Sequence, residues 1–124
     1  MIHFDTSFLI RALIKGTPAE QRLLDWDQSG ELMGVSAVAW SEFLCGPLTT
    51  EAKYTVLQTL TSPEPFLAED AEKAAELFNL TGRRSRSLAD CQIAAVALRV
   101  NAALATENRA DFAPFVPFGL IIAQ

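Results

Sequence analysis

The first seven residues of the chain, MIHFDTS, constrain its fold more than any other stretch. Ile2 and Phe4 are apolar, and the segment is short and free of Gly and Pro, as a buried strand requires. Helix-like sequence begins directly after Ser7. A strand that leads straight into a helix places Asp5 at the carboxyl end of a central strand, where open α/β sheets bind their ligands. We therefore predict that Asp5 is the first of several carboxylates that gather there around a divalent cation.

The rest of the chain alternates between short strands and helices. Further strands are expected at residues 32–36, 102–105 and 119–122, with at most a short edge strand at 65–67. Helices are expected at 8–14, 19–28, 37–44, 50–60, 69–80 and 89–100. This alternation predicts a single α/β domain over residues 1–124, with a short-stranded, mostly parallel sheet in a three-layer α/β/α arrangement.

Composition excludes several classes of protein. No apolar run approaches the roughly 20 residues of a membrane helix, and the N-terminus lacks the features of a signal peptide. The two cysteines, Cys45 and Cys91, have no CxxC spacing, so we expect a reducing cytoplasm and no disulfide framework. A net charge of −5 argues against a surface that binds nucleic acid everywhere. It still allows a local site where a cation and a few arginines meet phosphate.

Four acidic residues stand out by their position. Asp5 ends the first strand, and Glu42 lies among apolar neighbours in the helix after the second strand. Asp90 opens the alanine-rich helix at 89–100, and Asp111 follows the strand at 102–105. In a parallel sheet the ends of strands and the starts of the following helices lie along one edge. Acids from these four places can therefore converge.

Such a cluster has a definite chemistry. Neighbouring carboxylates raise one another's pKa values unless a cation neutralises them. Hard oxygen ligands select Mg²⁺ or Mn²⁺, whereas zinc lacks ligands because His3 is the only histidine and the cysteines are unpaired. A metal held in this way can activate water and stabilise charge on a phosphoryl oxygen, which is the chemistry of phosphodiester hydrolysis.

Each acid also has a simpler interpretation. Asp5 can serve only as a helix cap. Ser87 and Asp90 have the S-x-x-D spacing of a capping box, and a loop acid such as Asp111 is usually just solvated. Glu42 is harder to dismiss, because acids are rarely placed on the apolar side of a helix without a partner. The set of four is more informative than any member.

These residues match a known pattern. The chain resembles the PIN-domain ribonucleases, in particular the VapC-type toxins of bacterial toxin–antitoxin pairs, almost from end to end. The resemblance rests on Asp5-Thr6-Ser7 after an apolar strand, on Val35-Ser36 followed by Glu42 and Gly46, on Asp90 before Ile93-Ala94-Ala95-Val96-Ala97, and on Thr106, Asn108, Asp111 and Phe112.

The resemblance implies an acidic core of Asp5, Glu42 and Asp90, with Asp111 as a fourth member. It also implies Mg²⁺ or Mn²⁺ as the cofactor, RNA as the substrate, a homodimer, and a small antitoxin protein that blocks the site. Many members carry an acid where this chain has Asn108, which leaves the fourth ligand open between Asp111, Glu107 and neither.

The residues around the acids have implied roles as well. Thr6 and Ser7 would orient Asp5, and Thr106 and Asn108 would act near the fourth acid. The arginines near the acids are expected to hold RNA phosphates. In the simpler interpretation they are solvated. They are the loop residues Arg83, Arg84 and Arg86, which precede Asp90, and Arg109.

Other enzyme classes fit less well. A phosphatase of the haloacid-dehalogenase kind needs an acid two residues after the strand-end aspartate, where this chain has Ser7, and no acid ends the strand at Val35 as a response-regulator receiver would require. No P-loop motif is present. The remaining alternative is a PIN-fold module that binds RNA or protein with weak or no hydrolysis.

Overall fold

The computed structural model describes residues 1–84 and 87–124. Within them the chain forms short strands, one 3₁₀ helix (η2) and α-helices of up to 13 residues. In chain order these are β1 (Ile2–Phe4), α1 (Thr6–Ala12), α2 (Pro18–Gln28), β2 (Met33–Val35), α3 (Ala37–Leu44), α4 (Thr50–Thr59), α5 (Ala68–Leu80), α6 (Leu88–Arg99), β3 (Ala103–Ala105), α7 (Arg109–Phe112) and η2 (Ala113–Phe118).

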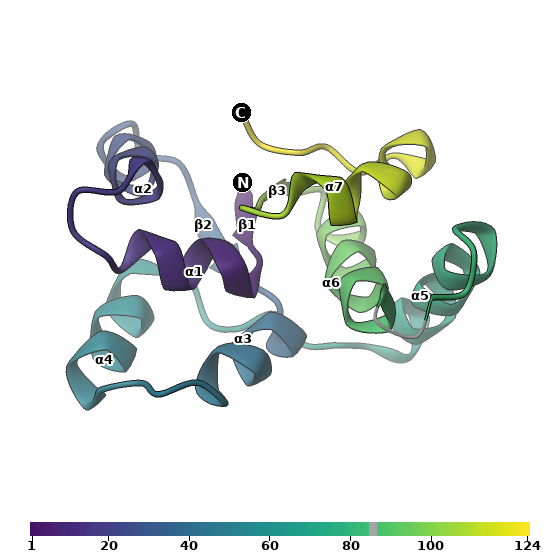
Figure 1. The fold of residues 1–124 in the computed structure, drawn as a ribbon, viewed down its shortest axis with the longest axis horizontal. Helices are drawn as coiled ribbons and strands as arrows, with labels where there is room; N and C mark the ends of the chain where they lie inside the picture. The colour runs from purple at the N-terminus through teal and green to yellow at the C-terminus, as the bar shows by residue number, and fades with distance from the viewer. Residues whose placement is uncertain (85–86) are drawn as a thin grey trace.

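The sheet has the order β2-β1-β3, and both pairings are parallel. The N-terminal strand is therefore central, with Phe4 opposite Val35 on one side and Ala105 on the other. In Figure 1, α1, α2 and α4 lie on one side of the sheet, and α5 and α6 lie on the other. The predicted three-layer α/β/α arrangement is confirmed.

Aromatic packing holds β1 against the helices that follow it. The Phe4 ring stacks on Phe8 of α1 and on Trp26 of α2, with ring centroids 5.0 Å and 5.8 Å apart. On the other face α6 is buried along most of its length, from Cys91 to Ala97 except for Gln92. A helix that is apolar nearly all round belongs inside a fold, and its alanines let α5 pack closely against it.

Two predicted strands do not form. At 65–67 no pairing forms: only Glu64, just before this segment, bonds to Val35 and Ala37, and the partner segment then continues as α3. At 119–122 a single bridge joins Ile122 to Leu104. There the next acceptor, the Ala123 carbonyl, is bound by two arginines instead of by the sheet.

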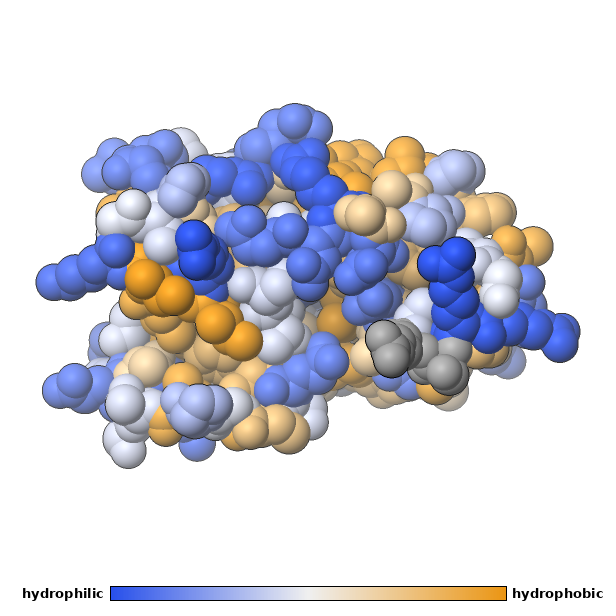
Figure 2. All heavy atoms as spheres, in the orientation of Figure 1, coloured by the Kyte–Doolittle hydropathy of each residue, from blue (hydrophilic) through white to orange (hydrophobic). Residues whose placement is uncertain are grey.

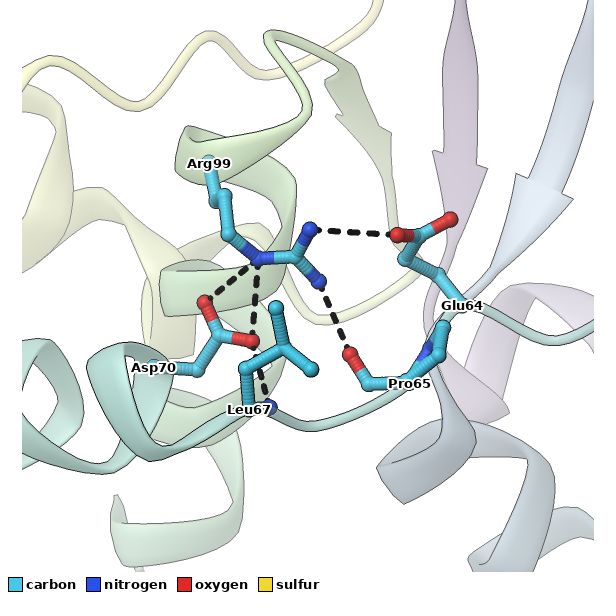
Figure 3. Close-up of polar contacts among 5 residues, drawn as sticks. All are labelled: Glu64, Pro65, Leu67, Asp70 and Arg99. Carbon is cyan, nitrogen blue, oxygen red and sulfur yellow. Dashed lines mark hydrogen bonds and ion pairs between the residues drawn. The ribbon is translucent and has the colours of Figure 1, made fainter.

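A buried ion-pair cluster joins α5 to α6. The Arg99 Nε donates to both carboxylate oxygens of Asp70, at 2.9 and 3.1 Å, and the other nitrogens reach Glu64 and the Pro65 carbonyl (Figure 3). Asp70 also accepts the backbone N–H of Leu67, which caps the start of α5. The cluster fixes the segment before α5 against the end of α6.

His3 lies beside this cluster in the sheet. Its side chain is buried, and its Nε2 atom has no hydrogen-bond partner among the described residues. Burial lowers the pKa of His3 to about 4, so the imidazole is neutral at physiological pH. A Cβ at Gly34 would lie 3.1 Å from Nε2, which explains a glycine on the neighbouring strand. His3 is thus a structural residue that faces away from solvent.

Across the described parts of the chain, no helix combines the length and the apolar composition that a membrane span requires.

Candidate active site

Asp5 lies at the junction between β1 and α1, and the residue is 4% exposed. Oδ1 accepts the Phe8 N–H at 2.9 Å and the Ser7 hydroxyl at 2.8 Å, and Oδ2 accepts the Thr106 hydroxyl. Asp5 therefore does cap α1. All three donors are neutral, so the buried carboxylate is well oriented but its charge is not neutralised.

A hydroxyl network connects this junction to the segment after β3. The Glu107 N–H donates to Ser7 Oγ at 3.1 Å, and the Asn108 N–H donates to Thr106 Oγ1 at 2.9 Å. Thr106 thus orients Asp5, not the fourth acid as we expected. Strand register explains this: Phe4 pairs with Ala105, so the next residues along the two strands, Asp5 and Thr106, are neighbours.

Glu42 is placed by α3, but its environment differs from the prediction. The buried residues of α3 are Ala39 and Phe43, whereas Glu42 is exposed to solvent, so its expected position on the apolar side is wrong. Its Oε1 accepts the Thr6 hydroxyl at 2.8 Å. Thr6 therefore orients Glu42, and the expected contact of Thr6 with Asp5 is absent from the described hydrogen bonds.

Asp90 and Asp111 share a pocket of about 390 Å³ between α6, α7 and the end of α5, which Arg84 also lines. The capping box expected for Asp90 does not form: Ser87 makes no cap hydrogen bond, and its hydroxyl donates to the Arg84 carbonyl at 2.7 Å. Asp90 has no hydrogen-bond donor among the described residues.

Electrostatics link the four acids. Burial, together with the negative charges of Asp111, Glu42 and Asp5, raises the pKa of Asp90 to about 6. Burial also raises the pKa of Asp5, and the charge of Glu42 adds to this effect while the three hydrogen bonds oppose it. None of the four forms a salt bridge with a described Lys or Arg. Among the described residues, therefore, no cation pairs with the negative charges of these acids at the edge of the sheet.

Sequence comparison assigns the chain to a family. The profile of the PIN domain matches residues 2–113. The chain belongs to the PIN-domain family. This confirms the family resemblance that the acids and the motifs around them indicated. No curated protein is significantly similar to the chain in sequence.

Solved structures agree with this fold. The VapBC2 complex of Rickettsia felis, bound to a DNA fragment from its promoter, contains a chain with a TM-score of 0.75 and 20% identity; the match covers 99% of this chain and 98% of that one. A toxin–antitoxin complex from Klebsiella pneumoniae gives a TM-score of 0.72 and 26% identity, covering 91% of both chains. FitAcB from Neisseria gonorrhoeae gives 0.73 and 21%, covering 100% and 97%.

The donor set of this PIN domain fits a hard divalent cation, because it consists of carboxylate oxygens with uncompensated charge. Within residues 1–84 and 87–124, however, no three Asp, Glu, His or Cys side chains are close enough to hold an ion as they stand. Repulsion between like charges favours such separation. Glu42 and Asp111 are exposed, so each can change rotamer to approach Asp5 and Asp90.

The predicted RNA-binding arginines divide into two groups. Arg83 and Arg84 follow α5 and are exposed, and Arg84 borders the pocket of Asp90; Arg86 lies outside the described residues. Arg109 extends instead toward the C-terminal tail, where it donates to the Ala123 carbonyl at 3.0 Å. Arg22 joins it there. Arg22 was not predicted, because nothing in the sequence around a single arginine on an amphipathic helix indicates a functional role.

Proposed function

We propose that this PIN-domain protein is an endoribonuclease that depends on Mg²⁺ or Mn²⁺. The observation that carries the proposal is the set of carboxylates at one sheet edge without a cationic partner, where Asp90 has a pKa raised to about 6. Perturbed carboxylates that serve no structural pairing are typical of functional sites.

Asp5, Glu42, Asp90 and Asp111 would hold the metal. When bound, it would supply an activated water and neutralise charge on the phosphoryl oxygen. Three donors fix the orientation of Asp5, whereas Glu42 would leave the Thr6 hydroxyl to reach the ion. Ordering the Asp5 oxygens in advance lowers the entropy lost when an ion and a substrate bind.

Asp111 is a better candidate than Glu107 for the fourth position. The charge of Asp111 is the largest electrostatic contribution to the raised pKa of Asp90, and the two side chains line one pocket. The charge of Glu107 instead acts on Arg22, and it does not contribute to the pKa shift of Asp90. Arg84, at the rim of the same pocket, would contact a phosphate of the RNA, with Arg83 and Arg86 nearby in sequence.

We further propose that the protein is the toxin of a toxin–antitoxin pair in the cytoplasm, acting as a homodimer. A groove between α1 and the segment after α3 is lined by Ile10, Leu13, Phe43, Pro47 and Leu48. Figure 2 shows hydrophobic surface over α1 on this face. Exposed apolar patches of this kind are typical of interaction sites, and an antitoxin segment with an apolar face would fit this one.

Cleavage of RNA tests the proposal. We expect the wild-type protein to cleave single-stranded RNA with Mn²⁺ or Mg²⁺ and to stop in EDTA. Asp5→Asn and Asp90→Asn should each lower the rate by more than about 100-fold, because each removes a metal ligand. Asp27→Asn, an exposed aspartate on α2, is the matched control and should cleave normally. Metal-independent cleavage would contradict the proposal, and RNA binding without cleavage would support the alternative of a binding module.

A further inference from the structure

Two arginines from distant elements meet at the C-terminal tail. Arg22 of α2 and Arg109 of α7 each donate from Nη2 to the carbonyl oxygen of Ala123, both at 3.0 Å. In Figure 1 the tail runs back from η2 and ends on the side of the molecule where α2 lies. One neutral oxygen thus lies between two guanidinium groups.

This pair has no acidic partner. In the described part of the chain, neither Arg22 nor Arg109 forms a salt bridge within 4.0 Å. Burial and the neighbouring charge of Arg109 lower the pKa of Arg22, although Glu107 partly opposes this. Each guanidinium has five N–H donors, and the described hydrogen bonds use one from each. Most donors of both groups are therefore available.

Arg22 is held in place without using those donors. Its guanidinium lies over the ring of Trp26, 4.8 Å from the centroid, and over the ring of Phe8 at 5.4 Å. Cation–π stacking fixes the plane of the group and leaves its edge N–H donors available. Arg99 differs, because its donors are used by Asp70, Glu64 and Pro65.

The pair is adjacent to the candidate active site. Phe8, which lies under Arg22, donates its N–H to Asp5, and Glu107, two residues before Arg109, donates its N–H to Ser7. Arg84 lies elsewhere, in the pocket of Asp90 and Asp111. The surface between α2 and α7 is hydrophilic in Figure 2. A polyanion at the acidic edge could therefore extend to the arginine pair.

We propose that Arg22 and Arg109 together bind a backbone phosphate of single-stranded RNA next to the cleavage site. This inference rests on the proposed function, and it adds Arg22 and the pairing to what the sequence predicted for Arg109. Two guanidinium groups that reach one acceptor are close enough to donate together to a phosphate, whose oxygens accept paired N–H donors from arginine.

Salt dependence of RNA binding tests the site. A fluorescein-labelled single-stranded RNA would be titrated with protein in EDTA, by fluorescence anisotropy, over a series of KCl concentrations. Removal of one phosphate contact should reduce the slope of log K against log[KCl] by about 0.7. We expect Arg22→Gln/Arg109→Gln to show at least this loss and to bind about 10-fold more weakly at low salt. Arg22→Lys should keep the slope and lose only part of the affinity, because it retains the charge without the fork.

The control variant also loses two positive charges, but at positions away from the arginine pair. Arg11→Gln/Lys53→Gln removes two exposed cations of α1 and α4, and it should bind RNA with the wild-type slope. Equal slopes for the two double variants would overturn the site, as would failure of the wild-type protein to bind RNA. A lower melting temperature with an unchanged slope would show that the pair only anchors the tail, which also overturns it. If the double variant does not fold, the single exposed change Arg109→Gln decides in the same way.

Because RNA binding is measured in EDTA, the phosphate site and the metal-dependent nuclease can fail independently. If the wild-type protein cleaves RNA but the arginine variants bind like the control, the nuclease stands and the phosphate site falls. If binding depends on the arginine pair but no metal supports cleavage, the phosphate site stands and the nuclease falls.

Discussion

Asp5 and Asp70 are two buried aspartates with opposite surroundings. Their residues are 4% and 1% exposed. Asp70 receives two hydrogen bonds from the Arg99 guanidinium and one from a backbone N–H (Figure 3). Asp5 receives bonds only from two hydroxyls and a backbone N–H, and the nearby charge of Glu42 is also negative.

The charge of Asp70 has a counter-ion within the fold, whereas the charge of Asp5 has none among the described residues. At Asp70 the counter-ion is part of the chain, so the pair serves to hold α5 against α6. At Asp5 the charge stays uncompensated, although burial of a charge without a partner is costly. Because such an arrangement lowers stability, its presence at the carboxyl end of the central strand indicates a ligand of opposite charge.

The largest expected effect separates the two aspartates by stability. Asp70→Asn should lower the free energy of unfolding by about 3 kcal/mol, because it leaves the partly buried Arg99 with Glu64 as its one acidic partner among the described residues. Asp5→Asn should stay within about 1 kcal/mol of the wild type in EDTA, since it removes a charge that had no counter-ion. Urea unfolding measures both. Glu69→Gln, an exposed neighbour on α5, is the control, and similar losses for Asp5→Asn and Asp70→Asn would remove the distinction.

A smaller effect of opposite sign is expected at Asp90. Its pKa in the folded protein is raised from 3.8 to about 6, so the folded state binds the proton more tightly than the unfolded state. The contribution of Asp90 to stability is therefore present at low pH and is lost as the pH rises from about 4 through 6. In EDTA at pH 7.5 we expect Asp90→Asn to be more stable by about 1 kcal/mol, a value reduced for the partial exposure of Asp90, or about 3 °C in melting temperature. At pH 4 the difference should vanish. An equal difference at both pH values would show that Asp90 does not carry the charge penalty.

The smallest effect is expected at His3, beside the paired cluster. Burial lowers its pKa from 6.5 to about 4, so the unfolded chain binds the proton more tightly. The contribution of a neutral His3 to stability is therefore fully present above pH 6.5 and is lost as the pH falls toward 4. From pH 7.5 to pH 6 this loss should be less than about 1 kcal/mol. Thermal unfolding of the Asp90→Asn variant and of the Asp90→Asn/His3→Gln double variant, at both pH values, isolates the contribution of His3. A parent that is insensitive to pH in this range would argue against a neutral, buried His3.

Local signals predicted much of the fold. The short run of residues 1–7, with apolar Ile2 and Phe4 and no Gly or Pro, located β1 and the cap at Asp5, and Ser36 before an apolar run gave the bounds of α3 correctly. The alanine-rich, nearly all-apolar pattern of residues 89–100 placed α6 in the interior. In each case residues close together in the sequence determine the local structure, so the position of the strand or helix can be predicted from the sequence alone.

Long-range partners could not be predicted in the same way. The hydroxyl of Thr6 bonds to Glu42, that of Thr106 bonds to Asp5, and Arg22 meets Arg109 on the tail. Each contact depends on strand register or on the path of the tail after Gly119, whose φ is +108°. No local pattern determines either feature, so the groups that orient the four acids were partly misassigned.

The central claim is that the four acids form one cation site, and direct counting of bound Mn²⁺ tests it most simply. Free Mn²⁺ would be measured by electron paramagnetic resonance during titration of the protein at pH 7.5. We expect saturable binding to the wild type and to Asp27→Asn, and loss of that binding in Asp5→Asn and Asp90→Asn. A wild-type protein that binds no Mn²⁺ at millimolar concentration, or variants that bind it equally well, would show that the four acids do not form a cation site.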